Sequence, residues 1–353
     1  MPSADSNARA SGRVLVVRLS SIGDIVHTLP AAAALAAAGH VVLWAAQPAG
    51  RPLVERNPAV AEAIAIPGRR VRAWRELAAS LRALRARRCD AALDFQGLWK
   101  SAFWARASGA RRTLGFAGRA RREPLSGLLL GERLPVPEGI RHVIDKNLAL
   151  LAGLGVAAVG ERRFPLPPVD REMAHVAREL AARGLASPVL LHPGGGWPGK
   201  LWPAERYGEL ARRLAERGLP SLVSWGPGEE GLADQVVAAA RGSAIKCFPA
   251  TLLELVALAR ASAVAVAADT GPLHLAAAAG TPVVALFGPT DPARNGPWDP
   301  ADRVVARRPA CFPCHRRDCR THAGVMHELP VDEVAGAVLD RLEASRQAGR
   351  RDV

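Results

Sequence analysis

Short apolar runs alternate with stretches that have the spacing of amphipathic helices along most of the chain. The first half predicts strands over 14–19, 40–46 and 91–95, each dominated by Val, Leu and Ala. An Ala-rich helix that ends at Gly39 is predicted after the first strand, and an Arg-rich helix over 69–88. This alternation indicates a parallel sheet that is covered by helices on both faces.

The same alternation restarts after a proline-rich segment at 164–170, where three prolines in seven residues stiffen the backbone and prevent regular strand pairing. Beyond this boundary, predicted strands cover 188–191, 221–225, 263–268 and 282–287, and predicted helices cover 204–217, 252–259 and 273–279. We therefore predict an α/β protein of two doubly wound, Rossmann-like domains, with a binding site in the cleft between the carboxyl ends of their strands.

The charge of the chain is distributed unevenly. The 353 residues include 47 Lys and Arg against 33 Asp and Glu, a formal net charge of +14. Residues 1–165 alone contain 25 basic and 12 acidic side chains, so nearly all of the excess lies in the first half. This asymmetry favours an anionic partner, such as a phosphorylated sugar, a membrane surface or a nucleic acid. Nucleic acid is the weakest of these, because no nucleic-acid-binding module is recognisable.

The sequence has no pattern typical of secretion or of membrane spanning. The first twelve residues are small and polar, which predicts no signal peptide. The most apolar later stretch, 261–289, is interrupted by Asp269 and Pro272 and therefore predicts no spanning helix. Five cysteines, an odd number, favour a reducing compartment over a disulfide framework. We expect a soluble protein or one that is attached to a membrane surface.

Two loops that follow predicted strands each contain a charged residue that is a candidate for catalysis or ligand binding. The loop at 20–24 ends in Asp24, which either caps the following helix or removes a proton from an acceptor hydroxyl. The loop at 192–203 is rich in glycine and contains Lys200. Backbone donors of such a loop can surround a phosphate while the ammonium group neutralises its charge, although the spacing is not that of a Walker loop.

Two further loops suggest contacts with a nucleotide. Thr270 and Gly271 open a predicted helix, whose free N–H groups favour a phosphate, and His274 is either part of that site or a satisfied buried histidine. Glu229 follows another predicted strand and either accepts from a ribose hydroxyl or begins an exposed helix. Neither half contains a G-x-G-x-x-G motif, so a nicotinamide or flavin cofactor is not supported.

Five motifs occur in order along the chain: RLSSIGDIVHTLPA at 18–31, DFQGLWKSA at 94–102, REPL at 122–125, GKLWP at 199–203 and DTGPLHLAAAAGTPVVALFGPTDP at 269–292. Together they resemble glycosyltransferase family 9, and within it the lipopolysaccharide heptosyltransferase I group, over roughly residues 13–345. The resemblance implies a GT-B fold and no cofactor. It also implies transfer of L-glycero-D-manno-heptose, with inversion, from ADP-heptose to the Kdo of a Kdo2-lipid A acceptor, at the cytoplasmic face of the inner membrane.

The resemblance also implies roles for individual residues. Asp24 matches the proposed base and Lys200 the lysine that binds the donor phosphates. The donor pocket is matched by Asp269, Thr270, Gly271 and His274. Glu229 matches the ribose-binding acid, with Glu230 as the alternative because this loop differs in length. Two donor-side threonines of the family are replaced by Gly195 and Gly196, where only backbone groups remain for contacts.

Acceptor binding is expected from basic residues of the first half. The candidates are Lys100, Arg119 and Arg122, with Asp94 and Gln96 nearby, and structural salt bridges are the alternative role for each. On this basis residues 1–167 form the acceptor-binding domain and residues 168–330 the nucleotide-sugar-binding domain. The C-terminal helix within 331–353 is expected to pack back on the N-terminal domain.

Metal binding is not expected to take part in the reaction. The chain has no Asp-x-Asp motif, so Lys200 and a helix dipole would replace a divalent ion on the donor phosphates. Cys311, Cys314 and Cys319 form a C-x2-C-x4-C pattern, but a structural zinc site usually has a clearer second pair of ligands. The sequence therefore favours reduced thiols in a surface loop over a zinc site.

Two other functions compete with this interpretation. The first is a GT-B transferase that adds a later heptose or uses another sugar, because the sequence does not reveal how acceptor-binding side chains are oriented. The second, more remote, is a non-catalytic nucleic-acid binder, which the net charge alone would permit.

Overall fold

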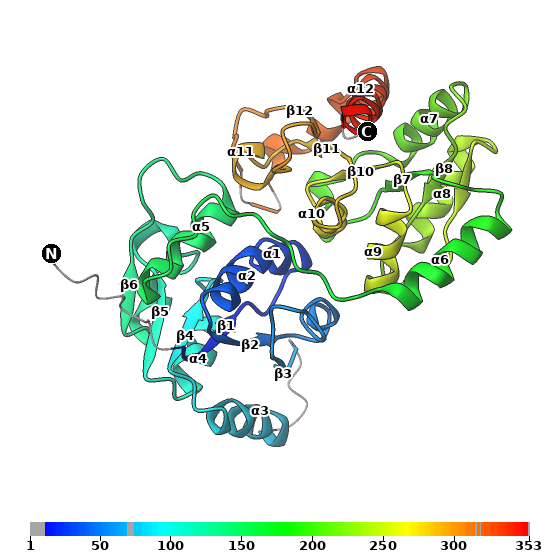
Figure 1. The fold of residues 1–353 in the computed structure, drawn as a ribbon. Coiled ribbons are helices and arrows are strands. Elements are labelled where there is room, and N and C mark those ends of the chain that lie inside the picture. Colours follow the sequence, from blue (N-terminus) through cyan, green and yellow to red (C-terminus); the bar gives the residue numbers. More distant parts are fainter. Residues whose placement is uncertain (1–10, 69–73, 315, 318, 352–353) are drawn as a thin grey trace, which may run out of the picture. The chain divides into compact units, whose positions relative to one another are not determined.

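The computed structural model describes residues 11–68, 74–314, 316–317 and 319–351, and these form two compact units (Figure 1). The first unit contains the chain up to Ser20, residues 27–140 and residues 144–167. The second contains residues 21–26, residues 141–143 and the chain from Pro168 onward. Each unit is built on its own six-stranded sheet with parallel strand pairs.

The first sheet has the strand order β3-β2-β1-β4-β5-β6. Its strands are β1 (Arg13–Val17), β2 (Val41–Ala46), β3 (Glu62–Ala65), β4 (Ala91–Asp94), β5 (Arg112–Phe116) and β6 (Glu132–Leu134). The α-helices of this half of the chain are α1 (Ile22–Val26), α2 (Leu29–Ala37), α3 (Trp74–Ala86), α4 (Trp99–Ala107) and α5 (Val143–Ala149). Its short 3-10 helices are η1 (Arg51–Leu53), η2 (Gly118–Ala120), η3 (Pro124–Leu129) and η4 (Leu150–Leu154).

The second sheet has the strand order β12-β11-β10-β7-β8-β9. Its strands are β7 (Val189–His192), β8 (Ser221–Val223), β9 (Ala244–Lys246), β10 (Val264–Ala268), β11 (Val283–Phe287) and β12 (Arg303–Ala306). The α-helices are α6 (Asp170–Ala182), α7 (Ala204–Ala215), α8 (Glu230–Ala240), α9 (Leu252–Arg260), α10 (Gly271–Ala278), α11 (Pro292–Asn295) and α12 (Val331–Arg351). The 3-10 helices are η5 (Pro198–Lys200), η6 (Arg320–His322) and η7 (Val325–Glu328).

Two doubly wound sheets confirm the predicted fold class, and two predicted helices differ in detail. The Ala-rich helix after β1 is two helices, because the chain turns at residues 27–28 and α2 then starts anew with Pro30 in its first turn. Gly39 ends this region as predicted, with a φ of 86° that glycine adopts readily. The Arg-rich helix predicted over 69–88 is observed as α3, and residues 69–73 lie outside the described residues.

The core of the second unit explains why its strands are apolar throughout. In β7, Val189 and Leu191 pack into one apolar cluster, whereas Leu190 between them packs into a second cluster. The alternating residues of β10 divide between the same two clusters. Side chains alternate between the two faces of a strand, and both faces of this sheet are covered by helices, so an apolar residue is favoured at every position.

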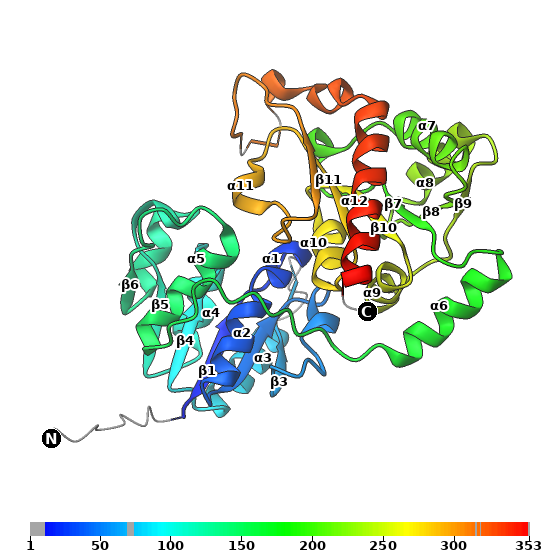
Figure 2. The same cartoon turned by 45° about the horizontal axis from the view of Figure 1, so that its top comes forward.

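The C-terminal helix packs on the second sheet. Val331, Val334 and Val338 of α12 are buried in the core cluster that also includes residues of β7 and β10. Figure 2 shows α12 lying alongside β11 and β10. The apolar stripe of this amphipathic helix is therefore used to complete the core of its own unit.

Both sheets follow the same winding. In each, the chain builds three strands outward in one direction, returns to the centre and builds the next three outward in the other direction. The direction reverses between β1 and β4 in the first sheet and between β7 and β10 in the second. Loops on either side of such a reversal diverge at the carboxyl edge of the sheet, which is where doubly wound proteins bind ligands.

Candidate functional site

In the second unit, two loops that carry candidate residues meet at the carboxyl edge of the sheet. β7 and β10 are neighbours, and His192 at the end of β7 pairs in register with Ala267. The glycine-rich loop follows β7 directly, and Asp269 follows β10. The point of reversal in the strand order therefore brings the two predicted donor-binding segments together.

Asp269 is the centre of a buried polar network. Its Oδ2 atom lies 2.5 Å from Lys200 Nζ and accepts hydrogen bonds from Thr290 Oγ1 at 2.6 Å and Asn295 Nδ2 at 3.4 Å. Its Oδ1 atom lies 3.1 Å from His274 Nε2. Four side chains, from the glycine-rich loop, the segment after β11, α11 and α10, thus converge on a single carboxylate, which fixes their positions relative to one another.

The surroundings keep Asp269 ionised. Burial alone would raise the pKa of its carboxyl group, but the hydrogen bond from His274 and the charge of Lys200 outweigh burial and hold that pKa well below its ordinary value. A carboxylate engaged in this way orients Lys200 and His274. We therefore describe Asp269 as a positioning residue, and His274 as a buried histidine that has Asp269 as its partner.

Lys200 is held from two further directions. Its Nζ atom donates to the carbonyl oxygen of Asp269 at 3.1 Å and lies 4.7 Å from the centroid of the Trp197 ring. The ring face attracts the ammonium group and restricts its motion. Trp197 is itself anchored, because its Nε1 donates to the carbonyl oxygen of Arg317 at 3.3 Å. The single lysine of this loop is therefore presented in a defined position.

The start of α10 offers backbone donors beside this lysine. Thr270 is the N-cap residue, but its hydroxyl donates to the carbonyl oxygen of Ala268 at 3.2 Å and makes no capping hydrogen bond to the helix. The N–H groups and the positive end of the helix dipole therefore remain suited to an anion. Lys200 and the α10 N-terminus together place an ammonium group beside backbone N–H donors, an arrangement that suits phosphates.

Gly195 allows the glycine-rich loop to lie against Thr270. A Cβ atom at residue 195 would be only 2.4 Å from Thr270 Cγ2, whereas a Cβ atom at Gly196 would meet no atom within 4 Å. The two positions that differ from the family pattern are therefore not equivalent. Only residue 195 requires the absence of a side chain.

Gly195→Ala is expected to weaken ADP binding by about tenfold or more, because the new methyl group must displace Thr270 or the loop at a cost of about 1–3 kcal/mol. Gly196→Ala is the matched control and should bind ADP like the unmodified protein. Isothermal titration calorimetry with ADP measures both affinities. Equal affinities for the two variants would contradict the assignment of this loop to the donor site.

Glu229, rather than Glu230, faces the glycine-rich loop. Glu229 Oε2 accepts from the backbone N of Gly226 at 3.0 Å and lies 3.7 Å from His192 Nε2. A Cβ atom at Gly194 would lie only 2.0 Å from the same oxygen, so the absence of a side chain at Gly194 permits this position of Glu229. Glu230 instead pairs with Lys246 at the surface, at 3.1 Å.

His192 is a neutral partner in this arrangement. Its side chain is buried, and burial lowers the pKa of the imidazole to about 4. The imidazole is therefore uncharged at neutral pH, with Nδ1 at 3.0 Å from Ser224 Oγ. His192 consequently places no positive charge beside Glu229.

The helix that carries Asp24 belongs to the second unit and packs against α10. A Cβ atom at Gly23 would lie 2.6 Å from His274 Cδ2, and one at Gly271 would lie 3.1 Å from Ile22 Cβ. Glycine at both positions permits this close approach. Asp24 accepts from Ser21 Oγ at 3.1 Å and from Ser21 N at 3.3 Å, so the capping role considered from the sequence is realised. Asp24 therefore directly follows Gly23, which lies against His274 of the Asp269 network.

The acceptor candidates lie in the first unit, in segments that follow β4 and β5. The carbonyl oxygen of Gly97 accepts from the backbone N atoms of Arg122 and Glu123, at 3.1 and 3.0 Å, which joins the two segments. Lys100 donates to Gln47 Oε1 at 3.2 Å. Arg119 is exposed in η2, close to Arg122 in the chain. The structure thus groups the three cationic candidates around one pair of loops.

Asp94 and Gln96 are buried and stabilise the loop that follows β4. Asp94 is fully buried and accepts from the backbone N atoms of Gln96 and Gly97 at 2.9 and 3.1 Å. Burial raises the pKa of its carboxyl group. Gln96 Oε1 accepts from the backbone N of Leu19 at 3.1 Å. Both side chains shape the loop that carries the cationic residues.

Several residues of the site were not identified from the sequence. Thr290, Asn295 and Trp197 support Asp269 and Lys200, and Gln47 supports Lys100. Thr290 lies within the motif at 269–292, which was the available signal. Asn295 and Gln47 act through contacts between segments that are distant in the chain, and spacing along the sequence does not reveal such contacts.

Comparison with known sequences gives a consistent result. Residues 77–323 match the family model described as glycosyltransferase family 9 (heptosyltransferase). Lipopolysaccharide heptosyltransferase 1 of Pseudomonas aeruginosa is 32% identical over 324 residues, which is 87% of each chain. The enzyme of the same name from Escherichia coli K12 is 32% identical over 311 residues, or 84% of this chain and 94% of that protein.

Solved structures with the same fold include two relatives of lower identity. The glycosyl transferase family 9 protein from Veillonella parvula superimposes with a TM-score of 0.79 at 20% identity, covering 94% of this chain and 97% of that one. E. coli heptosyltransferase WaaC with ADP superimposes with a TM-score of 0.76 at 24% identity, covering 93% and 99%. These similarities support the assignment of the fold.

Proposed function

The chain belongs to glycosyltransferase family 9, and from that premise we propose that it transfers L-glycero-D-manno-heptose from ADP-heptose to the Kdo of a lipopolysaccharide inner-core precursor. Family membership makes it a glycosyltransferase. The relatives at 32% identity carry the name lipopolysaccharide heptosyltransferase 1, which supports the first heptose over a later one. A nucleic-acid-binding role has no comparable support.

One observation carries the donor side of this proposal. Lys200 is fixed by Asp269 directly beside the uncapped N-terminus of α10. A nucleotide diphosphate has two adjacent anionic groups, and a fixed ammonium group next to several backbone N–H donors suits both. In the proposal, Glu229 accepts from a ribose hydroxyl and Gly195 and Gly196 contribute backbone groups.

The proposed reaction is a single displacement with inversion. Asp24 removes the proton from an acceptor hydroxyl as its oxygen attacks the anomeric carbon from the face opposite to ADP. The bond between the anomeric carbon and the phosphate oxygen breaks, and its electron pair remains on ADP. Lys200 and the α10 N-terminus stabilise the developing negative charge, which is the role of a divalent ion in many other nucleotide-sugar transferases. The reaction is therefore proposed to be metal-independent.

The acceptor side of the proposal rests on the charge of the first unit. Kdo carries a carboxylate and lipid A carries phosphates, so a cluster of cationic side chains suits both. Lys100, Arg119 and Arg122 supply that cluster from adjoining loops. We assign these three residues to acceptor binding.

Attachment to the inner face of the inner membrane is proposed through one apolar and basic surface of the first unit. Four large apolar side chains of α4 and η3 are exposed: Trp99 (49%), Phe103 (38%), Leu125 (67%) and Leu128 (72%). α4 and η3 pack against each other, and the exposed Arg106 lies on the same helix as Trp99 and Phe103. Apolar side chains rimmed by arginine are typical of segments that enter the interface of an anionic bilayer.

Replacing both leucines, Leu125→Asp with Leu128→Asp, is expected to weaken binding to phosphatidylglycerol-containing vesicles by about tenfold or more, because each leucine contributes about 1.5–3 kcal/mol when fully buried. Val159→Asp, at an exposed valine of the same unit, is the control. Vesicle co-sedimentation measures binding, and turnover of a deacylated, soluble acceptor should be unchanged in all variants. Full retention of the double variant on vesicles would contradict the assignment.

No helix within the described ranges is both long and apolar enough to cross a bilayer.

A donor and acceptor panel tests the proposed function directly. The protein is incubated with ADP-heptose, UDP-glucose or GDP-mannose and with Kdo2-lipid A or a heptosylated core, and products are identified by mass spectrometry. The expected result is addition of one heptose to Kdo2-lipid A from ADP-heptose, with inverted anomeric configuration by NMR. Transfer only to the heptosylated core, or only from another donor, would overturn the substrate assignment in favour of the alternative transferase.

A further inference from the structure

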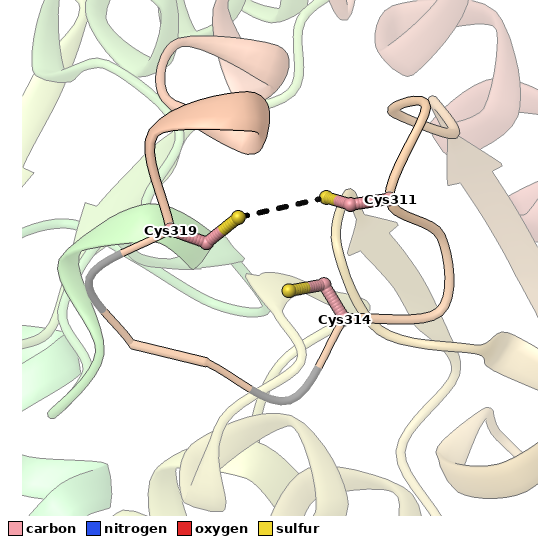
Figure 3. A group of neighbouring side chains, drawn as sticks. All are labelled: Cys311, Cys314 and Cys319. Carbon is pink, nitrogen blue, oxygen red and sulfur yellow. Dashed lines mark hydrogen bonds between the residues drawn. The ribbon is translucent and has the colours of Figure 1, made fainter.

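Three cysteines of one loop lie close enough together to share a ligand. The Sγ atoms of Cys311, Cys314 and Cys319 all lie within 4.8 Å of one another, and those of Cys319 and Cys311 are 3.8 Å apart (Figure 3). Cys314 is buried and the other two are half-buried. Among the residues that the structure describes, this is the only cluster of three or more Cys, His, Asp or Glu side chains with such spacing.

The spacing suits a tetrahedral ion better than a disulfide. A Zn–S bond of about 2.3 Å in a regular tetrahedron places two sulfur atoms about 3.8 Å apart. A disulfide requires a separation of about 2.05 Å. The sequence favoured separate thiols in a surface loop, because spacing along the chain does not show whether three sulfur atoms point to one centre.

We propose that Cys311, Cys314 and Cys319 bind one thiophilic metal ion as three thiolates, with a fourth ligand that is not a cysteine. Zn²⁺ is the ion that such sulfur-rich tetrahedral sites favour, and Fe²⁺ shares this ligand preference. Three thiolates and a divalent ion carry a net charge of −1, and the segment 307–320, with five arginines and one aspartate, is basic overall.

The position of the cluster indicates what the ion would do. Arg317 lies between Cys314 and Cys319, and its carbonyl oxygen accepts from the Trp197 indole that lies against Lys200. The backbone N of Cys314 donates to the carbonyl oxygen of Pro289 at 2.8 Å. Pro289 precedes Thr290, which donates to Asp269. An ion bound to the three cysteines would hold this loop in place and so stabilise the contacts around Lys200. Its role would be structural, and it would take no part in the reaction.

Zinc binding by the full-length protein tests the proposal. The protein is reduced, stripped with a chelator and titrated with Zn²⁺ against a chromophoric competitor, and bound metal is then measured by mass spectrometry. We expect about one equivalent per chain, with loss of stoichiometric binding in Cys311→Ser and Cys319→Ser. Cys89→Ala is the control, because Cys89 is buried in the core of the first unit. A parallel anaerobic titration with Fe²⁺ that shows the same dependence on these cysteines also supports the site.

Two further measurements keep the test independent of catalysis. Co²⁺ bound to three thiolates should give sulfur-to-metal charge-transfer absorption that both serine variants lack. Zn²⁺ should raise the unfolding temperature of the unmodified protein and of Cys89→Ala, because an ion that binds only the folded state stabilises it. Folded, reduced protein that binds neither ion stoichiometrically, or serine variants that bind it as well as the control, would overturn the proposal whatever the transferase activity.

Discussion

Asp24→Asn is expected to lower turnover by about 10²–10⁴-fold while ADP binding is largely retained. Asparagine has nearly the same shape and its side-chain oxygen can still accept from Ser21, so the helix start is preserved. The amide cannot remove a proton from the acceptor hydroxyl. Steady-state ADP release in the presence of the acceptor measures turnover, and calorimetry with ADP measures binding.

Ser21→Ala separates the two roles of Asp24. This change removes the hydroxyl that contacts the carboxylate but leaves the carboxylate itself, so the free energy of unfolding should fall by about 1 kcal/mol with only a modest effect on turnover. Near-normal turnover in Asp24→Asn would show that Asp24 only caps α1. In that case the proton must be removed by another group, and the proposed base would be wrong.

Lys200→Met is expected to lower kcat by about 10²–10³-fold, because the cation that stabilises the departing ADP is removed. The aliphatic side chain of methionine retains part of the packing against Trp197. Lys246→Met is the matched control, since Lys246 is at the surface and pairs only with Glu230 and Asp234 among its described acidic contacts. Its turnover should equal that of the unmodified protein.

The same substitution tests the electrostatics of Asp269. Without Lys200, the buried carboxylate loses one of the interactions that lower its pKa, so this pKa should rise and the folded state should be less stable. Lys200→Met combined with Asp269→Asn removes both charges and should recover part of that stability in urea unfolding. Recovered stability in the double variant would show that the unpaired Asp269 carboxylate destabilises Lys200→Met. Normal kcat in the single variant would contradict it.

The central strands of both sheets could be predicted from the sequence because they are buried on both faces. β1, β2, β4, β7, β10 and β11 are all short runs of apolar residues. The four edge strands β3, β6, β9 and β12 were missed, and so was β5. The edge strands have three or four residues each, most of them partly exposed. Such short segments do not show a pattern that distinguishes a strand from a loop.

The candidate site was predictable only in part, for a related reason. Lys200 and Thr270 follow central strands, so strand prediction also located them at the carboxyl edge. Thr290 and Asn295 support Asp269 from a third loop, and no local pattern marks them. The orientation of Asp269 toward Lys200 depends on which loops meet at the sheet edge. That information is contained in the strand order and not in the spacing of residues.

The winding shared by both sheets has a consequence for synthesis on the ribosome. Val14 of β1 pairs with Ala91 of β4, and Val189 of β7 with Val264 of β10, so each inner pair joins residues more than 70 positions apart. At about 5–20 residues per second, the later strand of each pair emerges roughly 4–15 s after the earlier one. During that interval one edge of β1, and later of β7, has no strand to pair with, which makes each nascent half a natural client for chaperones that shield unpaired apolar strands.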